Sequence, residues 1–470
     1  MSRIGARALR DAVLDEGSFR SWDAPPLDVA RSEDYQRELA EANAKTGLDE
    51  SVLTGEGTIF GRRVAVVVCE FDFLAGSIGV AAAERITAAV TRATAERLPL
   101  LASPSSGGTR MQEGTVAFLQ MVKIAAAVEL HKQAHLPYLV YLRHPTTGGV
   151  FASWGSLGHV TAAEPGALIG FLGPRVYEHL YGEPFPSGVQ TAENLHAHGV
   201  IDGVVPLALL RDTLDRTLRV IMDTPVDPAP APAPEPLPDV PAWDSVLASR
   251  RPDRPGVGYL LRHGATDRVL LSGTERGEAA TMLLALARFG GQPAAGRGMA
   301  LAAGLQLPLV LVIDTPGPAL SIEAEQGGLA GEIARCLAEL VTLDTPTVSV
   351  LMGQGSGGPA LAMVPADRVL VAANGWLAPL PPEGASAIVY RDTAHAAELA
   401  AAQGIRSVDL VRAGIADAVV PEHPDAADEP RAFTERLSSA IASELAALRA
   451  VPGERRLQAR LERYRRIGLA

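Results

Sequence analysis

The stretch Arg143-His144-Pro145-Thr146-Thr147-Gly148-Gly149-Val150-Phe151-Ala152-Ser153 decides the fold, because it joins an apolar, strand-like run to an alanine-rich segment through two adjacent glycines. Glycines at a strand-to-helix turn let the backbone approach a ligand closely and leave bare N–H groups, as an oxyanion hole requires. A single Gly-Gly pair is more often only a tight connection. The recurrence of this stretch later in the chain is what gives it weight.

The anchor residues of this region recur at an offset of 209 positions. Pro99 in Leu-Pro-Leu-Leu matches Pro308 in Leu-Pro-Leu-Val, and Gly148-Gly149 matches Gly357-Gly358. At the same offset the sequence SSGG at residues 105–108 falls on DTPG at residues 314–317, and GVIDGVVP at 199–206 recurs further on as GIADAVVP at 414–421. Agreement in anchors, order and spacing predicts two copies of one fold.

Within the first copy, strand patterns alternate with helix patterns. Residues 57–68 read as two strands joined by a tight turn at Gly61, and the later strands 98–102 and 137–142 each follow a helix. Such alternation predicts parallel βαβ units. The helix preceding the second of these strands, Met111 to Gln133, is predicted to be amphipathic, with one face carrying Val116, Leu119, Val122, Ala126 and Leu130.

A proline-rich segment divides the two copies. Residues 223–243 contain eight prolines, which is typical of a stiff, extended linker. We therefore expect an N-terminal domain at residues 1–222 and a C-terminal domain at residues 244–470.

Composition excludes several classes of function. A formal net charge of -12 argues against nucleic acid as the main partner. The two cysteines, Cys69 and Cys336, are too few for a four-cysteine zinc site and read as buried, so we expect no bound metal and a reducing compartment. No leader peptide or membrane-spanning run is recognisable, which predicts a cytoplasmic protein with no membrane partner.

The second copy is shorter than the first. Phe60 precedes Pro99 by 39 positions, whereas Phe289 precedes Pro308 by 19. About one strand, one loop and part of a helix are missing, and the join from Gln292 to Met299 lacks strand character. Either the second copy is naturally truncated or a loop of the protein is absent from this sequence.

Other side chains offer weaker candidates for chemistry. Arg110 has a guanidinium that suits a phosphate or a carboxylate, with an ordinary surface ion pair as the alternative. Core or solvated roles are favoured for the nearby histidines, and caps or surface roles for the possible carboxylate bases; these residues are His131, His135, His144 and His159, and Glu113, Glu164 and Glu383. Dinucleotide-binding and Walker A glycine motifs are absent.

Longer motifs carry a family resemblance. The sequences SSGGTRMQE at 105–113, PTTGGVFAS at 145–153 and AEPGALIGFLGPRV at 163–176 resemble the beta subunit of bacterial acetyl-CoA carboxylase carboxyltransferase. The sequences IDTPG at 313–317, GQGSGGPALA at 353–362 and PPEG at 381–384 resemble its alpha subunit. The resemblance covers nearly the whole chain outside the linker. It implies an α/β fold of two tandem crotonase-like domains, each a spiral of ββα units.

The resemblance also implies a reaction. In this family, carboxybiotin on a separate carrier protein releases CO2, and the enolate of an acyl-CoA captures it. Gly148 and Gly149 would hold the acyl thioester oxygen, and Gly357 and Gly358 the ureido oxygen of biotin. The substrate-binding residues would be Ser106, Gly107, Gly108, Arg110 and Gly317.

The implied partners are a biotin carboxylase, a biotin carboxyl carrier subunit and the acyl-CoA itself. The family's active site lies between the first half of one subunit and the second half of another, which implies a homodimer or homohexamer.

Three features depart from the family pattern. The chain lacks the four-cysteine zinc ribbon, the shortened segment would sit beside the biotin site, and Pro359 has no N–H. The second oxyanion hole, which would hold the biotin oxygen, is intact if the N–H groups of Gly357 and Gly358 are its donors. It is impaired if an N–H at position 359 is required. The leading hypothesis is an acyl-CoA carboxyltransferase with acetyl-CoA as the first substrate to test. The alternatives are a malonyl- or glutaconyl-type decarboxylase and a non-catalytic structural subunit.

Overall fold

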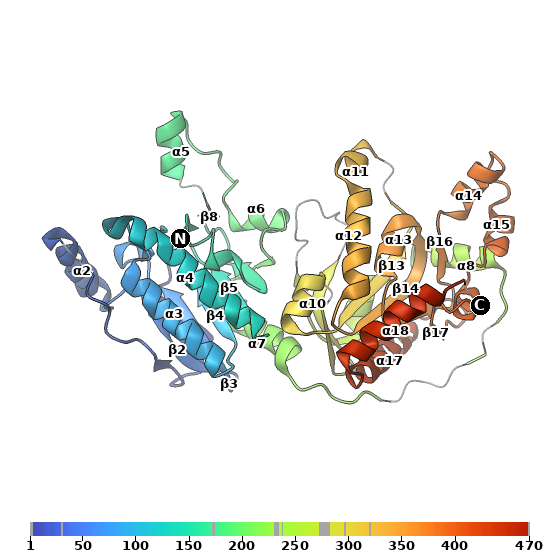
Figure 1. Ribbon diagram of the computed structural model, residues 1–470, viewed down its shortest axis with the longest axis horizontal. Helices are drawn as coiled ribbons and strands as arrows, with labels where there is room; N and C mark the ends of the chain where they lie inside the picture. The colour runs from blue at the N-terminus through green and yellow to red at the C-terminus, as the bar shows by residue number, and fades with distance from the viewer. Residues whose placement is uncertain are drawn as a thin grey trace. The chain divides into compact units, whose positions relative to one another are not determined.

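The computed structural model describes residues 3–29, 32–171, 174–229, 235–236, 238–271, 283–295, 298–318 and 321–468. The chain divides into two compact units (Figure 1). The first unit comprises Met1–Ile221 and Leu270–Leu284, and the second comprises Met222–Val269 and Ala285–Ala470. Each unit is built on its own largely parallel sheet.

The first sheet has the strand order β1-β2-β3-β4-β5-β7-β9. Its strands β2 and β3 form an antiparallel hairpin through Gly61, and every pairing from β3 onward is parallel. The central strands are buried along their length, as expected for parallel strands covered on both faces. The bounds are β1 Arg20–Ser21, β2 Val52–Ile59, β3 Arg62–Cys69, β4 Leu100–Ser103, β5 Tyr138–Leu142, β7 Val160–Ala163 and β9 Gly203–Val204.

Helices α3 (Val80–Ala95) and α4 (Gly114–Gln133) pack side by side over this sheet (Figure 1). The face of α4 that was predicted to be apolar is not the face that packs against the rest of the unit, so this prediction is wrong. Val116, Leu119, Val122 and Leu130 are each more than half exposed, whereas the buried positions are Ala117, Met121, Ile124, Ala127, Val128 and His131. The helix is apolar on more than one side, so periodicity alone does not identify the side that packs.

The remaining elements of the first unit connect or cap the sheet. Ser32 accepts a hydrogen bond from Tyr35 N (3.2 Å) and caps the helix that follows it. A small separate sheet pairs β6 (Thr146–Thr147) with β8 (Ile169–Gly170). The helices are α1 Ala6–Val13, α2 Glu33–Thr46, α5 Pro174–Tyr181, α6 Ala192–Ala197 and α7 Leu207–Met222, with short 3-10 turns at Leu74–Gly76, Met111–Glu113 and Trp154–Ser156.

The second sheet has the order β10-β11-β12-β13-β14-β15-β17, with β16 paired to β14. It repeats the plan of the first: an antiparallel hairpin, β11–β12, leads into parallel strands. The bounds are β10 Ala265–Leu271, β11 Leu284–Phe289, β12 Gln292–Ala295, β13 Leu309–Thr315, β14 Thr347–Ser356, β15 Arg368–Ala372, β16 Trp376–Ala378 and β17 Ala418–Val420.

The shortened region of the second copy contains a strand that the sequence did not indicate. Residues Gln292–Ala295 form β12, paired with β11 in a register that sets Phe289 opposite Gln292. The expectation of no strand character there is wrong, because pairing across the turn at Gly290-Gly291 outweighs the weak local preference of Pro293 and two alanines. The following residues 296–297 lie outside the described part. Helix α10 has 7 residues where α3 has 16.

The other helices of the second unit surround its sheet. Their bounds are α8 Ala242–Ser249, α9 Val257–His263, α10 Met299–Leu305, α11 Ile322–Gln326, α12 Leu329–Thr342, α13 Gly357–Met363, α14 Pro382–Val389, α15 Ala396–Ala402, α16 Ser407–Arg412, α17 Pro430–Arg449 and α18 Gly453–Arg466. The proline-rich linker contains no helix or strand in its described residues before α8 begins; residues 230–234 and 237 lie outside them.

Both cysteines are free. Cys69 is buried, as predicted, whereas Cys336 is only partly buried, so the prediction of burial is wrong for it. Among the described residues, no helix is both long and apolar enough to cross a membrane.

Candidate functional site

The first unit brings its two glycine turns together. Ser106 N donates to Pro145 O (2.7 Å) and Thr147 N donates to Ser106 O (2.9 Å), so the loop after β4 lies directly against the loop that carries Gly148. A Cβ built on Gly108 would lie 3.7 Å from Gly149 N. The structure therefore joins Ser106, Gly107 and Gly108 with Gly148 and Gly149, the residues that the family resemblance implies for one site.

The hydrogen bonds distinguish the amides that are free from those that are occupied. Gly107 N donates to Ala75 O (2.9 Å), Gly108 N to Ser106 Oγ (3.0 Å) and Gly148 N to Gly170 O (3.1 Å). Among the described residues, no acceptor faces the N–H of Gly149 or of Val150. The free donors of the first turn are thus Gly149 and Val150. Gly148 instead supplies the turn conformation, with φ of +63°.

Thr109 also borders this turn, and no sequence pattern had marked it as a site residue. A Cβ built on Gly149 would lie 3.6 Å from Thr109 Oγ1 and 3.4 Å from Met121 Cγ. The space beside the Gly149 Cα is therefore small and has one hydroxyl on its wall. Any side chain larger than methyl at position 149 would fill it.

Arg110 does not face this space. Its side chain is fully buried, and its guanidinium donates to Glu50 Oε2 (2.9 Å), to Ser77 O (2.8 Å) and to Tyr35 OH (3.2 Å). Burial alone lowers the pKa of Arg110, but the ion pair with Glu50 raises it above its ordinary value. The interpretation of Arg110 as a phosphate or carboxylate ligand is wrong in this structure, because its donors are taken by protein groups. Arg110 is a positioning residue for the loop after β4.

The other titratable candidates of the first unit are also structural. Glu113 Oε2 accepts from Val80 N (2.6 Å) at the start of α3, so the predicted capping role is confirmed. His131 is buried beside Thr94 Oγ1 (3.0 Å), and burial lowers the pKa of His131 to about 4. His159 accepts from Tyr138 N (3.1 Å), and burial lowers the pKa of His159 to about 3. Both histidines are neutral near pH 7.

The second unit repeats the first at the level of single hydrogen bonds. Gly317 N donates to Thr315 Oγ1 (3.3 Å), which reproduces the bond of Gly108 N to Ser106 Oγ. The φ angles match as well: +125° at Gly317 against +108° at Gly108, and +68° at Gly357 against +63° at Gly148. The predicted duplication is therefore present in the turns themselves.

A strand contact further along is repeated too. Asp202 Oδ2 accepts from Thr161 N (2.7 Å), and Asp417 Oδ2 accepts from Val369 N (2.6 Å). These aspartates belong to the repeated GVIDGVVP and GIADAVVP segments.

The second glycine turn offers its free amides at different positions. Gly357 and Gly358 begin α13, and the described residues supply no acceptor for either N–H. Pro359 follows with no N–H, where the first turn has the amide of Val150. This arrangement leaves two amides, those of Gly357 and Gly358, as the possible donors.

A polar group missed by sequence analysis lies beside this turn. Asp314, at the end of β13, accepts from Gln354 N (2.9 Å), and burial raises the pKa of Asp314. Gln354 Oε1 accepts from Arg250 Nε (3.2 Å), and Arg250 also pairs with Glu383. Glu383 is therefore held in an ion pair rather than free as a base.

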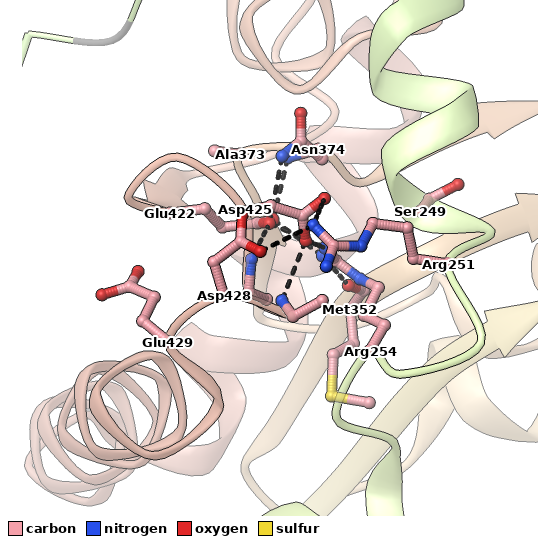
Figure 2. Close-up of polar contacts among 12 residues, drawn as sticks. Ser249, Arg251, Arg254, Met352, Ala373, Asn374, Glu422, Asp425, Asp428 and Glu429 are labelled. Atoms are coloured by element: carbon pink, nitrogen blue, oxygen red, sulfur yellow. Dashed lines mark hydrogen bonds and ion pairs between the residues drawn. The ribbon is translucent and has the colours of Figure 1, made fainter.

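A buried cluster fixes the strand that leads to Gly357. Figure 2 shows Arg254 directed at Glu422, with both guanidinium branches donating to its carboxylate (each 2.7 Å). Arg254 also donates to Met352 O (2.9 Å) in β14, and Asn374 Nδ2 donates to Glu422 (3.0 Å). The Arg254 and Glu422 side chains are 3% and 0% exposed, so this pair is part of the scaffold.

Comparison with known families assigns the chain. Residues 3–295 match the carboxyl transferase domain, and residues 291–468 match the acetyl co-enzyme A carboxylase carboxyltransferase-like family. The chain belongs to the carboxyl transferase family. The resemblance of its first part to beta subunits and of its second part to alpha subunits is confirmed.

Relatives of this carboxyl transferase cover its full length. It is 75% identical to the probable biotin-dependent acyl-coenzyme A carboxylase beta3 subunit of Mycobacterium tuberculosis strain H37Rv, over 100% of this chain and 99% of the relative. It is 35% identical to the acetyl-coenzyme A carboxylase carboxyl transferase subunits beta/alpha of Salinispora arenicola, over 99% and 91%. The mycobacterial alignment spans 493 positions against 470 residues here, so at least 23 positions (493 − 470) lack a counterpart.

Solved structures show the same fold. The transcarboxylase 12S hexamer structure has a TM-score of 0.74 at 20% identity, covering 95% of this chain and 90% of that chain. A single-chain, multi-domain long-chain acyl-CoA carboxylase has a TM-score of 0.70 at 18% identity, covering 94% and 46%. The predicted fold of two tandem crotonase-like α/β domains is confirmed. Among the described residues, no group of three or more His, Cys, Asp or Glu side chains has the arrangement of a metal site.

Proposed function

We propose that this chain is the carboxyltransferase component of a biotin-dependent acyl-CoA carboxylase, with acetyl-CoA as the first substrate to test. The observation that carries the proposal is the pair of free amides at Gly149 and Val150, set against the Ser106–Gly108 loop. Removal of the α-proton of an acyl-CoA places negative charge on the thioester oxygen. Two converging N–H groups in a small space stabilise that charge, and losing one such donor typically costs about 10²- to 10³-fold in rate.

The second turn suits the other reactant. The amides of Gly357 and Gly358 would donate to the ureido oxygen of biotin carried on a separate protein, and carboxybiotin, when bound, supplies the CO2. The residues fit this group, because two adjacent amides without protein acceptors begin α13. In the first unit, Gly149 and Val150 hold the enolate oxygen, while Ser106, Gly107 and Gly108 line the thioester side. We infer a cytoplasmic location, which suits the proposed reaction and its proposed partners.

Exposed apolar helices support self-association. In α4, Val116, Phe118 and Val122 are 59–66% exposed, and in the corresponding helix α12 only Leu340 is buried. Surfaces of this kind on a globular chain typically mark protein interfaces. A second molecule of this chain presents the same α4 surface, so two copies of that surface can pack on one another. We infer a homo-oligomer.

Reconstitution tests the catalytic role. The full chain, a biotin carboxylase and its carrier are mixed with labelled bicarbonate, ATP and acetyl-, propionyl- or longer acyl-CoA, and carboxylated product is measured by mass. Gly149→Val fills the space before the amides, and we expect its turnover to fall about 10²-fold or more. Gly258→Ala is the matched control, since nothing lies within 4 Å of that position. Absence of product with every acyl-CoA tested refutes the proposal. Net decarboxylation in the same assay indicates the reverse reaction.

A non-catalytic structural subunit is the second candidate, favoured by the shortened second copy and by Pro359. Under that reading, Gly149→Val leaves the activity of the assembled complex unchanged. A further arm inserts the corresponding segment of the mycobacterial relative after Ala295. A large rise in turnover from a very low starting rate favours the structural reading of the natural chain, and an unchanged high rate favours the catalytic one.

A further inference from the structure

A cavity of about 320 Å³ lies at the edge of the second sheet opposite its glycine turn. It opens between the starts of β15 and β17 and the helices α17 and α18. Because β14 and β15 are parallel, the amino end of β15 lies at the opposite edge from Gly357, which follows the carboxyl end of β14. The cavity is therefore separate from the site described above. The residues that matter on its wall are Asp367, Arg368, Asp417, Arg456, Arg460 and Arg463.

One of these arginines is wholly structural. Arg460 is 2% exposed and donates to both oxygens of Asp367 (2.9 and 2.7 Å) and to Leu343 O (2.8 Å). These bonds dock α18 against the sheet. They also occupy the Asp367 carboxylate, which accepts Thr347 N as well (2.8 Å).

The other arginines contribute positive charge to the wall, whereas the Nε atoms of Arg456 and Arg463 are buried from solvent and do not face the cavity. Arg456 is nine-tenths buried, and its Nη1 and Nη2 donate to Val451 O (3.0 Å) and Asp344 O (2.7 Å). Its buried Nε has no hydrogen-bond acceptor among the described residues; Asp367 Oδ2 is 3.6 Å away. The buried Nε of Arg463 likewise lacks an acceptor in the described part of the chain.

The acceptors on the wall are already engaged. Asp417 Oδ2 accepts from Val369 N and from Arg463 Nη1 (each 2.6 Å), as Asp367 accepts from Arg460 and Thr347. Arg368 is 44% exposed and pairs with Glu444 (3.1 Å). Four guanidinium groups thus face two carboxylates on the wall, with Glu444 as a third behind Arg368. A net positive cavity in a chain of formal charge -12 calls for a negatively charged ligand.

We propose that this cavity is a binding site for a small oxyanion metabolite, one that presents a phosphate or carboxylate group to Arg368, Arg456 and Arg463. Guanidinium groups bind these oxyanions through charge-assisted hydrogen bonds and remain charged at all physiological pH values. The volume is at the lower end of that of small-molecule sites, which suits a ligand of a few carbons or two phosphates rather than a nucleotide.

Calorimetric titration of the full chain at constant ionic strength tests the site, with inorganic phosphate, pyrophosphate and malonate as probes. We expect saturable binding of at least one probe, and the probe that binds most tightly distinguishes a phosphate from a carboxylate ligand. Arg368→Gln and Arg463→Gln should each weaken it about tenfold or more. Arg466→Gln is the matched control, because Arg466 lies on the same helix, is 78% exposed and, within the described part of the chain, forms an ion pair with Glu462 alone.

Arg463 also donates to Ile415 O, so its variant is first checked for an unchanged melting temperature without ligand. If the Arg463 variant is less stable, the test rests on Arg368→Gln, because Arg368 is 44% exposed on the cavity wall. The proposal is overturned if no probe binds saturably at concentrations up to about 10 mM, which lies above the dissociation constants expected of a weak metabolite site. It is equally overturned if Arg368→Gln and Arg466→Gln weaken binding to the same extent, which indicates an adventitious ion only.

Discussion

Removing one partner of the Arg110–Glu50 pair should unfold the first unit at a markedly lower temperature. Both side chains are almost fully buried, at 0% and 2% exposure, and Arg110 also donates to Ser77 O and Ser51 Oγ. Breaking a buried ion pair leaves an uncompensated charge and costs about 3–5 kcal/mol. In a domain of about 200 residues, 1 kcal/mol shifts the melting temperature by roughly 2–4 °C, so Arg110→Met should lower it by roughly 6–20 °C.

Thermal unfolding by circular dichroism measures this effect, and steady-state kinetics gives the KM for acyl-CoA. Glu50→Gln should be nearly as destabilising as Arg110→Met, and the double variant should recover part of the loss, because neither charge is then left alone. Arg37→Met, which removes an exposed pair with Asp34, should change nothing measurable. The reasoning fails if Arg110→Met keeps the wild-type melting temperature and raises only the KM for acyl-CoA, since that is the result for a phosphate ligand.

Further predictions concern acid stability, assembly and the scaffold of the second turn. Burial lowers the pKa of His131 to about 4 in the folded protein, against about 6.5 in the unfolded chain. The unfolded chain therefore binds this proton first, and the free energy of unfolding falls by up to about 3 kcal/mol as the pH drops from 6.5 to 4. Urea unfolding of His131→Gln should show a flatter pH dependence of that free energy between pH 6.5 and 4. Phe118→Glu on α4 should reduce the mass of the assembly in light scattering, whereas Thr91→Glu, at an exposed position of α3, should not, and equal masses would argue against an interface at α4. Glu422→Gln should destabilise the second unit in urea unfolding by less than the roughly 3–5 kcal/mol of an uncompensated buried charge, because the buried Arg254 loses Glu422 but keeps Asp425 (3.2 Å) as a partner.

The glycine turns were accessible from sequence because a turn is a local structure that repeats when its residues repeat. The offset of 209 positions predicted that Gly148 and Gly357 are equivalent, and their φ angles agree within a few degrees. Which amide remains free was not accessible in this way. The N–H of Gly148 is occupied by Gly170 O, an acceptor 22 positions away whose location depends on the pairing of β6 with β8.

The incorrect predictions for Arg110 and for α4 arise because contacts between residues far apart in the sequence decide both outcomes. Arg110 looked like a ligand because it follows a glycine loop, yet its partner Glu50 lies 60 positions earlier. In α4, apolar residues occupy several sides, so periodicity does not identify the packed face. The sheet selected the side with Ala117, Ile124 and Ala127, and left the larger side chains exposed.

The two copies hold their first turn by different means. In the first unit, hydrogen bonds from the segment before α3 fix the loop: Gly107 N donates to Ala75 O (2.9 Å), and Ile78 N donates to Gly108 O (2.9 Å). The second copy is short in that very segment, but its loop reads Thr315-Pro316-Gly317-Pro318, and Pro316 stands where Gly107 would donate. Proline rings fix φ without any partner. Because Gly317 still adopts a φ of +125°, close to that of Gly108, the turn keeps its shape without the missing residues. The shortening therefore removes hydrogen bonds that this loop does not need for its conformation. This favours a functional second glycine turn over a purely structural role of the chain.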